Sequence, residues 1–73
     1  MTVVLSDRWR VVDEPLQWIL QRRERKPGLR ASGWSARSYC GTRDGLLRCI
    51  REYCGAIDPA ALAILVGLPE AHA

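Results

Sequence analysis

The chain has 73 residues, with 11 Lys or Arg, 8 Asp or Glu and a formal net charge of +3. A chain of this length forms one domain, and it buries only about 60% of the surface that its unfolded form exposes. Its apolar runs are shorter than the roughly 20 residues of a transmembrane helix, and the run at residues 1–5 is too short for a secretion signal. Length and composition therefore exclude a multidomain protein and one with helical membrane spans.

The positive charge is concentrated in the first part of the chain. Residues 1–43 contain nine Arg or Lys and four acids, whereas residues 44–73 contain two and four. This asymmetry is typical of a protein that contacts an anionic partner such as nucleic acid, and equally of a solvated surface.

The cysteines do not form a metal-binding pattern. Cys40, Cys49 and Cys54 include no C-x-x-C pair, and the only histidine is His72. Structural zinc needs four such ligands, so we expect neither a metal site nor a cofactor. An odd number of cysteines without a secretion signal favours a reducing, cytoplasmic location in which the thiols serve as small core residues.

Three stretches show the alternation of a β-strand. They are Arg8–Val12, Leu16–Lys26 and Trp34–Cys40. Leu16–Lys26 also fits helical spacing, but we favour a strand because Pro15 precedes it and an alternating stretch lies on each side. The turn at residues 13–15 and the basic loop around Pro27-Gly28 then predict an antiparallel meander.

Alternation assigns each strand side chain to one of two faces. In the second stretch, Leu16, Trp18 and Leu20 are predicted to face the core. The third stretch is predicted to add Trp34, Ala36, Ser38 and Cys40 to the same face. The open face is then predicted to hold Arg10, Gln17, Ile19, Gln21, Arg23, Ser35, Arg37 and Tyr39.

Two helices are predicted after the strands. Thr42 is a suitable N-cap for an amphipathic helix over Arg43–Cys54, which Gly55 ends. Asp58 and the proline after it predict a second, short helix over Pro59–Val66. Because this second helix is apolar all round, it must be covered by the sheet edge and the first helix, or by a second subunit.

The predicted fold class is α+β: a three-stranded antiparallel β-meander packed on one amphipathic helix, with a short C-terminal helix. In this β-β-β-α-α arrangement, residues 1–7 form a flexible arm, residues 8–69 the domain and residues 70–73 a frayed tail. Residues 3–5 are apolar enough to form a short edge strand instead, and the sequence leaves that alternative open.

No combination of residues provides catalytic chemistry. His72 lies near the end of the chain, and no Ser or Cys occurs in a nucleophile elbow. Asp13 and Glu14 are turn residues, while Asp44 and Asp58 have helix-start roles that use their charge. We therefore expect that the protein is not an enzyme.

The open face carries residue types that bind DNA. Arg side chains bind guanine edges, Gln side chains bind adenine, and a β-sheet can enter the major groove. Cations in the loop would contact phosphates. The predicted nucleic-acid-binding residues are Arg10, Gln17, Gln21, Arg23 and Arg37 on the sheet, and Arg25, Lys26 and Arg30 in the loop. A solvated sheet face without a ligand would have a similar composition.

The run LQWILQRR, followed by a polar loop, the strand Trp34–Tyr39 and an amphipathic helix, resembles short uncharacterised proteins of phages and prophages. This resemblance covers Gln17–Cys54. The order of three strands and a helix is also similar to the plant ethylene-response type of DNA-binding domain and to phage integrase arm-binding domains. The first resemblance implies a small phage-like accessory protein, and the second implies that the sheet is presented to duplex DNA. The chain departs from these DNA-binding domains because its first two strands lack a dense set of Arg and Trp, and because it adds a second helix.

The second hypothesis is a protein-interaction module or inhibitor without a nucleic-acid role. Its apolar C-terminal helix would make a homodimer or host-protein contact through Ile64 and Leu65. The basic loop would then only keep the protein soluble.

Overall fold

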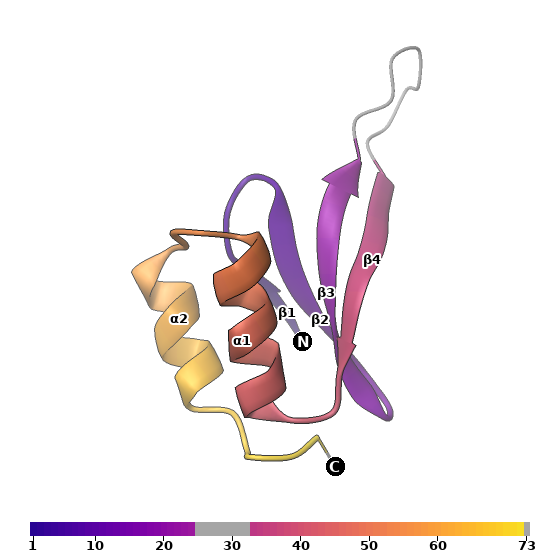
Figure 1. Ribbon diagram of the computed structural model, residues 1–73, viewed down its shortest axis with the longest axis vertical. Helices are drawn as coiled ribbons and strands as arrows, with labels where there is room; N and C mark the ends of the chain where they lie inside the picture. The colour runs from indigo at the N-terminus through magenta and orange to yellow at the C-terminus, as the bar shows by residue number, and fades with distance from the viewer. Residues whose placement is uncertain (25–32, 73) are drawn as a thin grey trace.

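Four strands and two helices follow one another along the chain of the computed structural model, which describes residues 1–24 and 33–72. The elements are β1 (Thr2–Val4), β2 (Trp9–Glu14), β3 (Gln17–Glu24), β4 (Gly33–Cys40), α1 (Arg43–Tyr53) and α2 (Pro59–Val66). The strands form one antiparallel sheet in the order β1-β2-β3-β4, and both helices lie on the same face of it (Figure 1). The predicted α+β class is therefore confirmed.

The sheet has four strands rather than the expected three, because part of the predicted arm at residues 1–7 is the edge strand β1. Val3 pairs with Val11 of β2 and is buried, as is Leu5 just after the strand. The carbonyl of Leu5 also accepts a hydrogen bond of 2.9 Å from the backbone N–H of Asp58. Burying one such side chain stabilises the fold by about 1.5–3 kcal/mol, which opposes fraying of this edge.

The hairpin between β2 and β3 is tighter than expected. Glu14 pairs with Gln17, so Pro15 and Leu16 alone form the turn and Asp13 lies within β2. Leu16 is 82% exposed, and its predicted place in the core-facing row is wrong. A side chain at the tip of a two-residue turn extends beyond the sheet and cannot reach either packed face.

A β-bulge at Arg37 changes the register between β3 and β4. Leu20 pairs with Ser38, but the next residue, Gln21, pairs with Ala36, so that β4 has one extra residue. One extra residue moves every side chain beyond it to the opposite face. Ser38 and Cys40 keep their predicted face, whereas Trp34, Ala36, Ser35 and Arg37 are on the opposite side from that expected.

Both helices form where they were predicted. The Oγ1 atom of Thr42 accepts a hydrogen bond of 3.1 Å from the Gly45 N–H, and Oδ1 of Asp58 accepts one of 3.0 Å from the Ala60 N–H. Gly55, with φ of 64°, adopts the left-handed conformation that lets the chain reverse between α1 and α2. Within the described residues, neither helix has the length and apolarity needed to cross a membrane.

The core fills the space between the sheet and the helices. Leu46 and Ile50 of α1, together with Ala61 and Leu65 of α2, pack against the helix-facing side of the sheet. The buried apolar residues of this cluster are Val3, Leu5, Val11, Trp18, Leu20, Cys40, Leu46, Ile50, Ala61 and Leu65. Trp18 and Leu20 thus face the core as predicted.

Ala71 and His72, which were expected to belong to a frayed tail, are held against the rest of the fold. Ala71 forms a bridge with Thr42, and the His72 N–H donates a hydrogen bond of 2.9 Å to the Gly41 carbonyl. The His72 ring packs edge-on against Trp18, with ring centroids 4.8 Å apart, and its side chain contacts Asp13. These contacts attach Ala71 and His72 to Trp18 of β3 and to the connection between β4 and α1. The segment therefore closes the end of the core at which β4 leads into α1 (Figure 1).

Candidate nucleic-acid interface

The open face of the sheet carries Arg10, Gln17, Gln21 and Arg23, as predicted. Arg10 and Gln21 are cross-strand partners, and Nε of Arg10 donates a hydrogen bond of 2.6 Å to Oε1 of Gln21. Tyr39, also predicted here, is 63% exposed opposite Ile19. Two of the predicted base-reading groups therefore bind one another.

Trp34 lies under the two arginines of this face. The guanidinium carbon Cζ of Arg10 is 4.2 Å from the centroid of the Trp34 ring, and that of Arg23 is 4.9 Å from it. The bulge is the reason, because it moves Trp34 out of the predicted core row. Cation–π contacts of this kind contribute about 0.5–1 kcal/mol each at exposed sites. They also fix both guanidinium groups in position and cover the indole.

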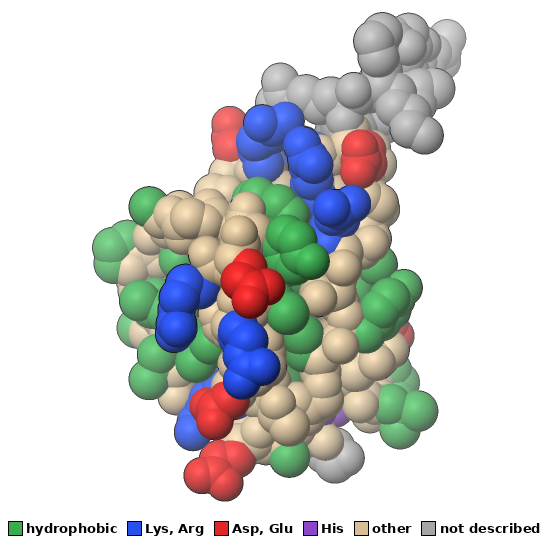
Figure 2. Space-filling model, viewed as in Figure 1, with side chains coloured by type: hydrophobic (Ala, Val, Ile, Leu, Met, Phe, Trp, Pro, Cys, Tyr) green, Lys and Arg blue, Asp and Glu red, His purple; other side chains and the backbone are tan. Residues whose placement is uncertain are grey.

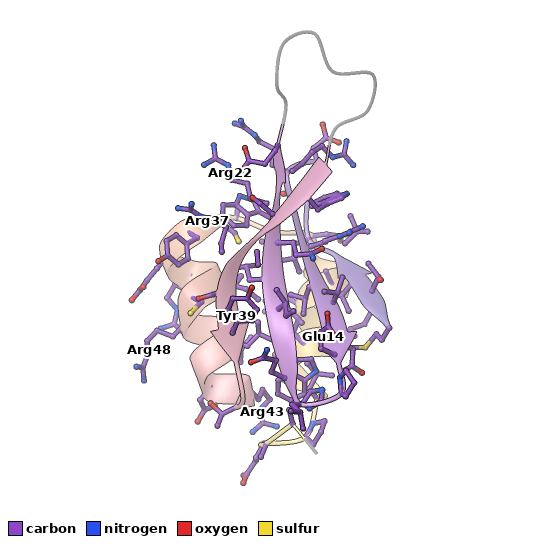
Figure 3. The ribbon with its side chains drawn as sticks, turned by 90° about the vertical axis from the view of Figure 1, so that its right-hand side faces the viewer. Glu14, Arg22, Arg37, Tyr39, Arg43 and Arg48 are labelled. Carbon is purple, nitrogen blue, oxygen red and sulfur yellow. The ribbon has the colours of Figure 1, made fainter. Side chains whose placement is uncertain are left out.

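A second group of arginines lies at the same end of the sheet, on the face that carries the helices. These arginines and two aromatic residues line a groove of about 270 Å³, which we call the arginine–aromatic groove. Its lining residues are Arg8, Trp9, Arg22, Arg37 and Tyr53. Figure 3 shows Arg22 and Arg37 extending toward the α1 side of the sheet. In Figure 2, Arg side chains (blue) form a band across this end of the molecule, above α1.

Aromatic rings hold the arginines of the groove. Trp9 and Tyr53 stack with ring centroids 6.2 Å apart and an interplanar angle of 25°. Cζ of Arg22 lies 6.0 Å from the Trp9 ring, and Cζ of Arg37 lies 5.9 Å from the Tyr53 ring. The guanidinium groups of Arg22 and Arg37 are thus each placed by an aromatic ring, and their N–H donors are left for another partner.

The charge of the groove is not neutralised within the described part of the chain. Among the described residues, no acidic side chain forms an ion pair with Arg8, Arg22 or Arg37. Three unpaired guanidinium groups around one hollow attract an anion, and arginine binds phosphate or carboxylate with two parallel hydrogen bonds.

The groove contains residues that the sequence-based site left out. Arg37 was predicted for the open face, whereas Arg8, Trp9, Arg22 and Tyr53 were not predicted as site residues. Alternation along β3 does place Arg22 on the same, helix-facing side as Trp18 and Leu20. A charged residue among core-facing positions was therefore the signal in the sequence that could have indicated the groove. The predicted loop cations Arg25, Lys26 and Arg30 lie outside the described residues.

The two residues predicted for a protein interface differ in exposure on α2. Ile64 is 51% exposed, but Leu65 is completely buried and cannot contact a partner. Leu62 and Val66, one helical turn apart, are exposed and line a groove of about 510 Å³ between the helices, whereas Ile64 is exposed on the opposite side of α2. The exposed apolar residues of α2 therefore form two separate surfaces.

The cysteines pack together without forming a disulfide. The Sγ atoms of Cys40 and Cys49 are 3.9 Å apart, and the Ser38 hydroxyl donates a hydrogen bond of 3.2 Å to Cys49 Sγ. Burial, and to a lesser extent the neighbouring Cys49, raises the pKa of Cys40 and that of Cys54 to about 11. Both thiols are therefore protonated at neutral pH and are poor nucleophiles. In the described ranges, no three His, Cys, Asp or Glu side chains are grouped to hold a metal ion.

Comparison with protein-family models, with curated proteins and with solved structures gave no match. The arguments for function therefore depend on the geometry of the chain itself.

Proposed function

We propose that the protein is a nucleic-acid-binding module that contacts phosphate groups with the arginines at one end of its sheet. The observation that carries this proposal is the position of five arginines around the ends of β2, β3 and β4. Arg10 and Arg23 lie on the open face, and Arg8, Arg22 and Arg37 on the other. Positive charge on both faces of the sheet, at the same end of its strands, suits an extended polyanion better than a small isolated anion.

The sequence between Glu24 of β3 and Gly33 of β4 contains three further cations, Arg25, Lys26 and Arg30, which lie outside the described residues. Phosphate contacts supply most of the affinity in such complexes, and base contacts supply sequence specificity. Because Arg10 and Gln21 bond one another, we propose phosphate contact rather than reading of duplex base edges as the main role of the open face.

The test is fluorescence anisotropy with a labelled duplex and with one of its single strands, each at 50 and 200 mM salt. For about three phosphate contacts, the affinity is expected to fall roughly 20- to 40-fold between these concentrations. Arg22→Gln combined with Arg37→Gln should weaken binding. Arg48→Gln combined with Arg51→Gln removes the same charge from exposed positions on α1 and should have little effect. Absence of binding to both probes at 50 mM salt would contradict the proposal.

A protein-interaction module is the second candidate, favoured by the exposed apolar residues of α2. Leu62, Ile64 and Val66 are each between 44% and 56% exposed on a helix of eight residues. Light scattering of the wild-type protein, of Ile64→Asp and of Leu62→Asp tests self-association through either exposed side of α2. A dimer that becomes monomeric on substitution supports it, and a wild-type monomer rules out a homodimer.

A further inference from the structure

We infer that the arginine–aromatic groove binds one nucleotide unit of a single-stranded nucleic acid, with the phosphate among Arg8, Arg22 and Arg37 and the base on the ring of Tyr53. This inference depends on the proposed nucleic-acid-binding function and specifies the form of nucleic acid that the groove takes.

The first argument is the combination of cations and aromatic rings. Proteins that bind single strands pair a basic groove for the backbone with aromatic side chains on which bases stack. Here the cations and the rings line the same hollow, and the Arg37 guanidinium is 5.9 Å from the Tyr53 ring. A phosphate at Arg37 would therefore place its attached nucleoside next to that ring.

The second argument is the exposure of the rings. Tyr53 is 47% exposed, although it stacks on Trp9. The ring therefore has free surface for a base. One guanidinium group, that of Arg37, lies over the Tyr53 ring, whereas Trp34 on the open face is less exposed than Tyr53 and has the guanidinium groups of both Arg10 and Arg23 over its ring. Tyr53 is thus better placed for stacking than the covered indole.

The third argument is the shape of the site. The groove has a volume of about 270 Å³ and lies between the sheet and the last residue of α1. Bases in a duplex are stacked on one another and do not offer their faces to a side chain. An unpaired base can enter a hollow of this size, so the groove selects a single strand.

The test compares two tyrosine substitutions in the full chain. Anisotropy is measured with labelled oligothymidine and with a mixed-sequence duplex. Tyr53→Leu should weaken oligothymidine binding at least five-fold, because loss of base stacking costs roughly this factor or more, and it should weaken duplex binding clearly less. Tyr53→Phe should retain binding. The matched control is Tyr39→Leu on the open face, which should bind oligothymidine as the wild type does. Thermal melts confirm that each variant is folded.

The outcomes separate this inference from the proposed function. Binding of both probes with no effect of Tyr53→Leu would overturn the single-strand site while leaving nucleic-acid binding intact. An equal loss in Tyr39→Leu would place base stacking on the open face and also overturn the inference. Failure of the wild type to bind either probe would contradict the inference and the proposed function together.

Discussion

The guanidinium carbon of Arg37 lies 5.9 Å from the ring centroid of Tyr53, on the helix-facing side of the sheet. Simple strand alternation places Arg37 on the other side. The β-bulge between the Leu20–Ser38 and Gln21–Ala36 pairs accounts for the difference. It brings one arginine to the groove and sends Trp34 to the open face, so a single inserted residue determines the composition of both surfaces.

The β2–β3 register makes opposite predictions for two leucines. Leu20 is completely buried, whereas Leu16 is 82% exposed. Leu20→Ala should lower the free energy of unfolding by about 2–5 kcal/mol, since it removes core contacts and leaves a cavity. Leu16→Ala should change it by less than about 0.5 kcal/mol. Urea denaturation measures both, and similar losses in the two variants would contradict the register.

The edge strand β1 offers a test with neighbouring valines. Val3 faces the core and is 4% exposed, whereas Val4 is 61% exposed. Val3→Ala is expected to destabilise the protein by about 1–3 kcal/mol through lost burial. Val4→Ala is expected to cost less than about 1 kcal/mol, from strand propensity alone. If residues 1–7 were a free arm, neither substitution would shift the denaturation midpoint.

The two helices could be predicted because the residues that start them and give them an apolar side lie close together in the sequence. Thr42 and Asp58 cap their helices as predicted, and the apolar side of α1 follows from its spacing. The bulge had no such signal, because Arg37 is an ordinary strand residue and the register depends on pairing with β3. Leu16 was misplaced for a related reason: turn length is set by which residues pair across the hairpin, here Glu14 with Gln17.

Most of the candidate site could not be predicted for the same reason. The open-face residues Arg10, Gln21 and Arg23 were assigned correctly, because they lie on β2 and β3 and the extra residue is in β4. The groove instead depends on Tyr53 meeting Trp9 across the layers, which only the packing of α1 on the sheet determines.

Stability should depend on the buried thiols at alkaline pH. The pKa of Cys40 rises from its ordinary 9.0 to about 11 on folding, mainly through burial. Between these values the folded state retains a proton that the unfolded state has lost. The contribution of the Cys40 thiol to the free energy of unfolding is therefore fully present below pH 9 and is lost as the pH rises toward 11. Denaturation midpoints of the wild type should fall more steeply over this interval than those of Cys40→Ala, whereas parallel curves would show that Cys40 does not contribute.

The central claim, phosphate contact by arginines at one end of the sheet, is tested most directly by the salt dependence of binding. The slope of log Kd against log salt concentration is measured for the labelled single strand with the wild type and two double variants. Arg22→Gln with Arg37→Gln should reduce the slope by about 1.4, since each lost phosphate contact removes roughly 0.7. Arg48→Gln with Arg51→Gln should leave the slope unchanged. A slope that is the same in all three proteins, or reduced equally in both variants, would contradict the claim.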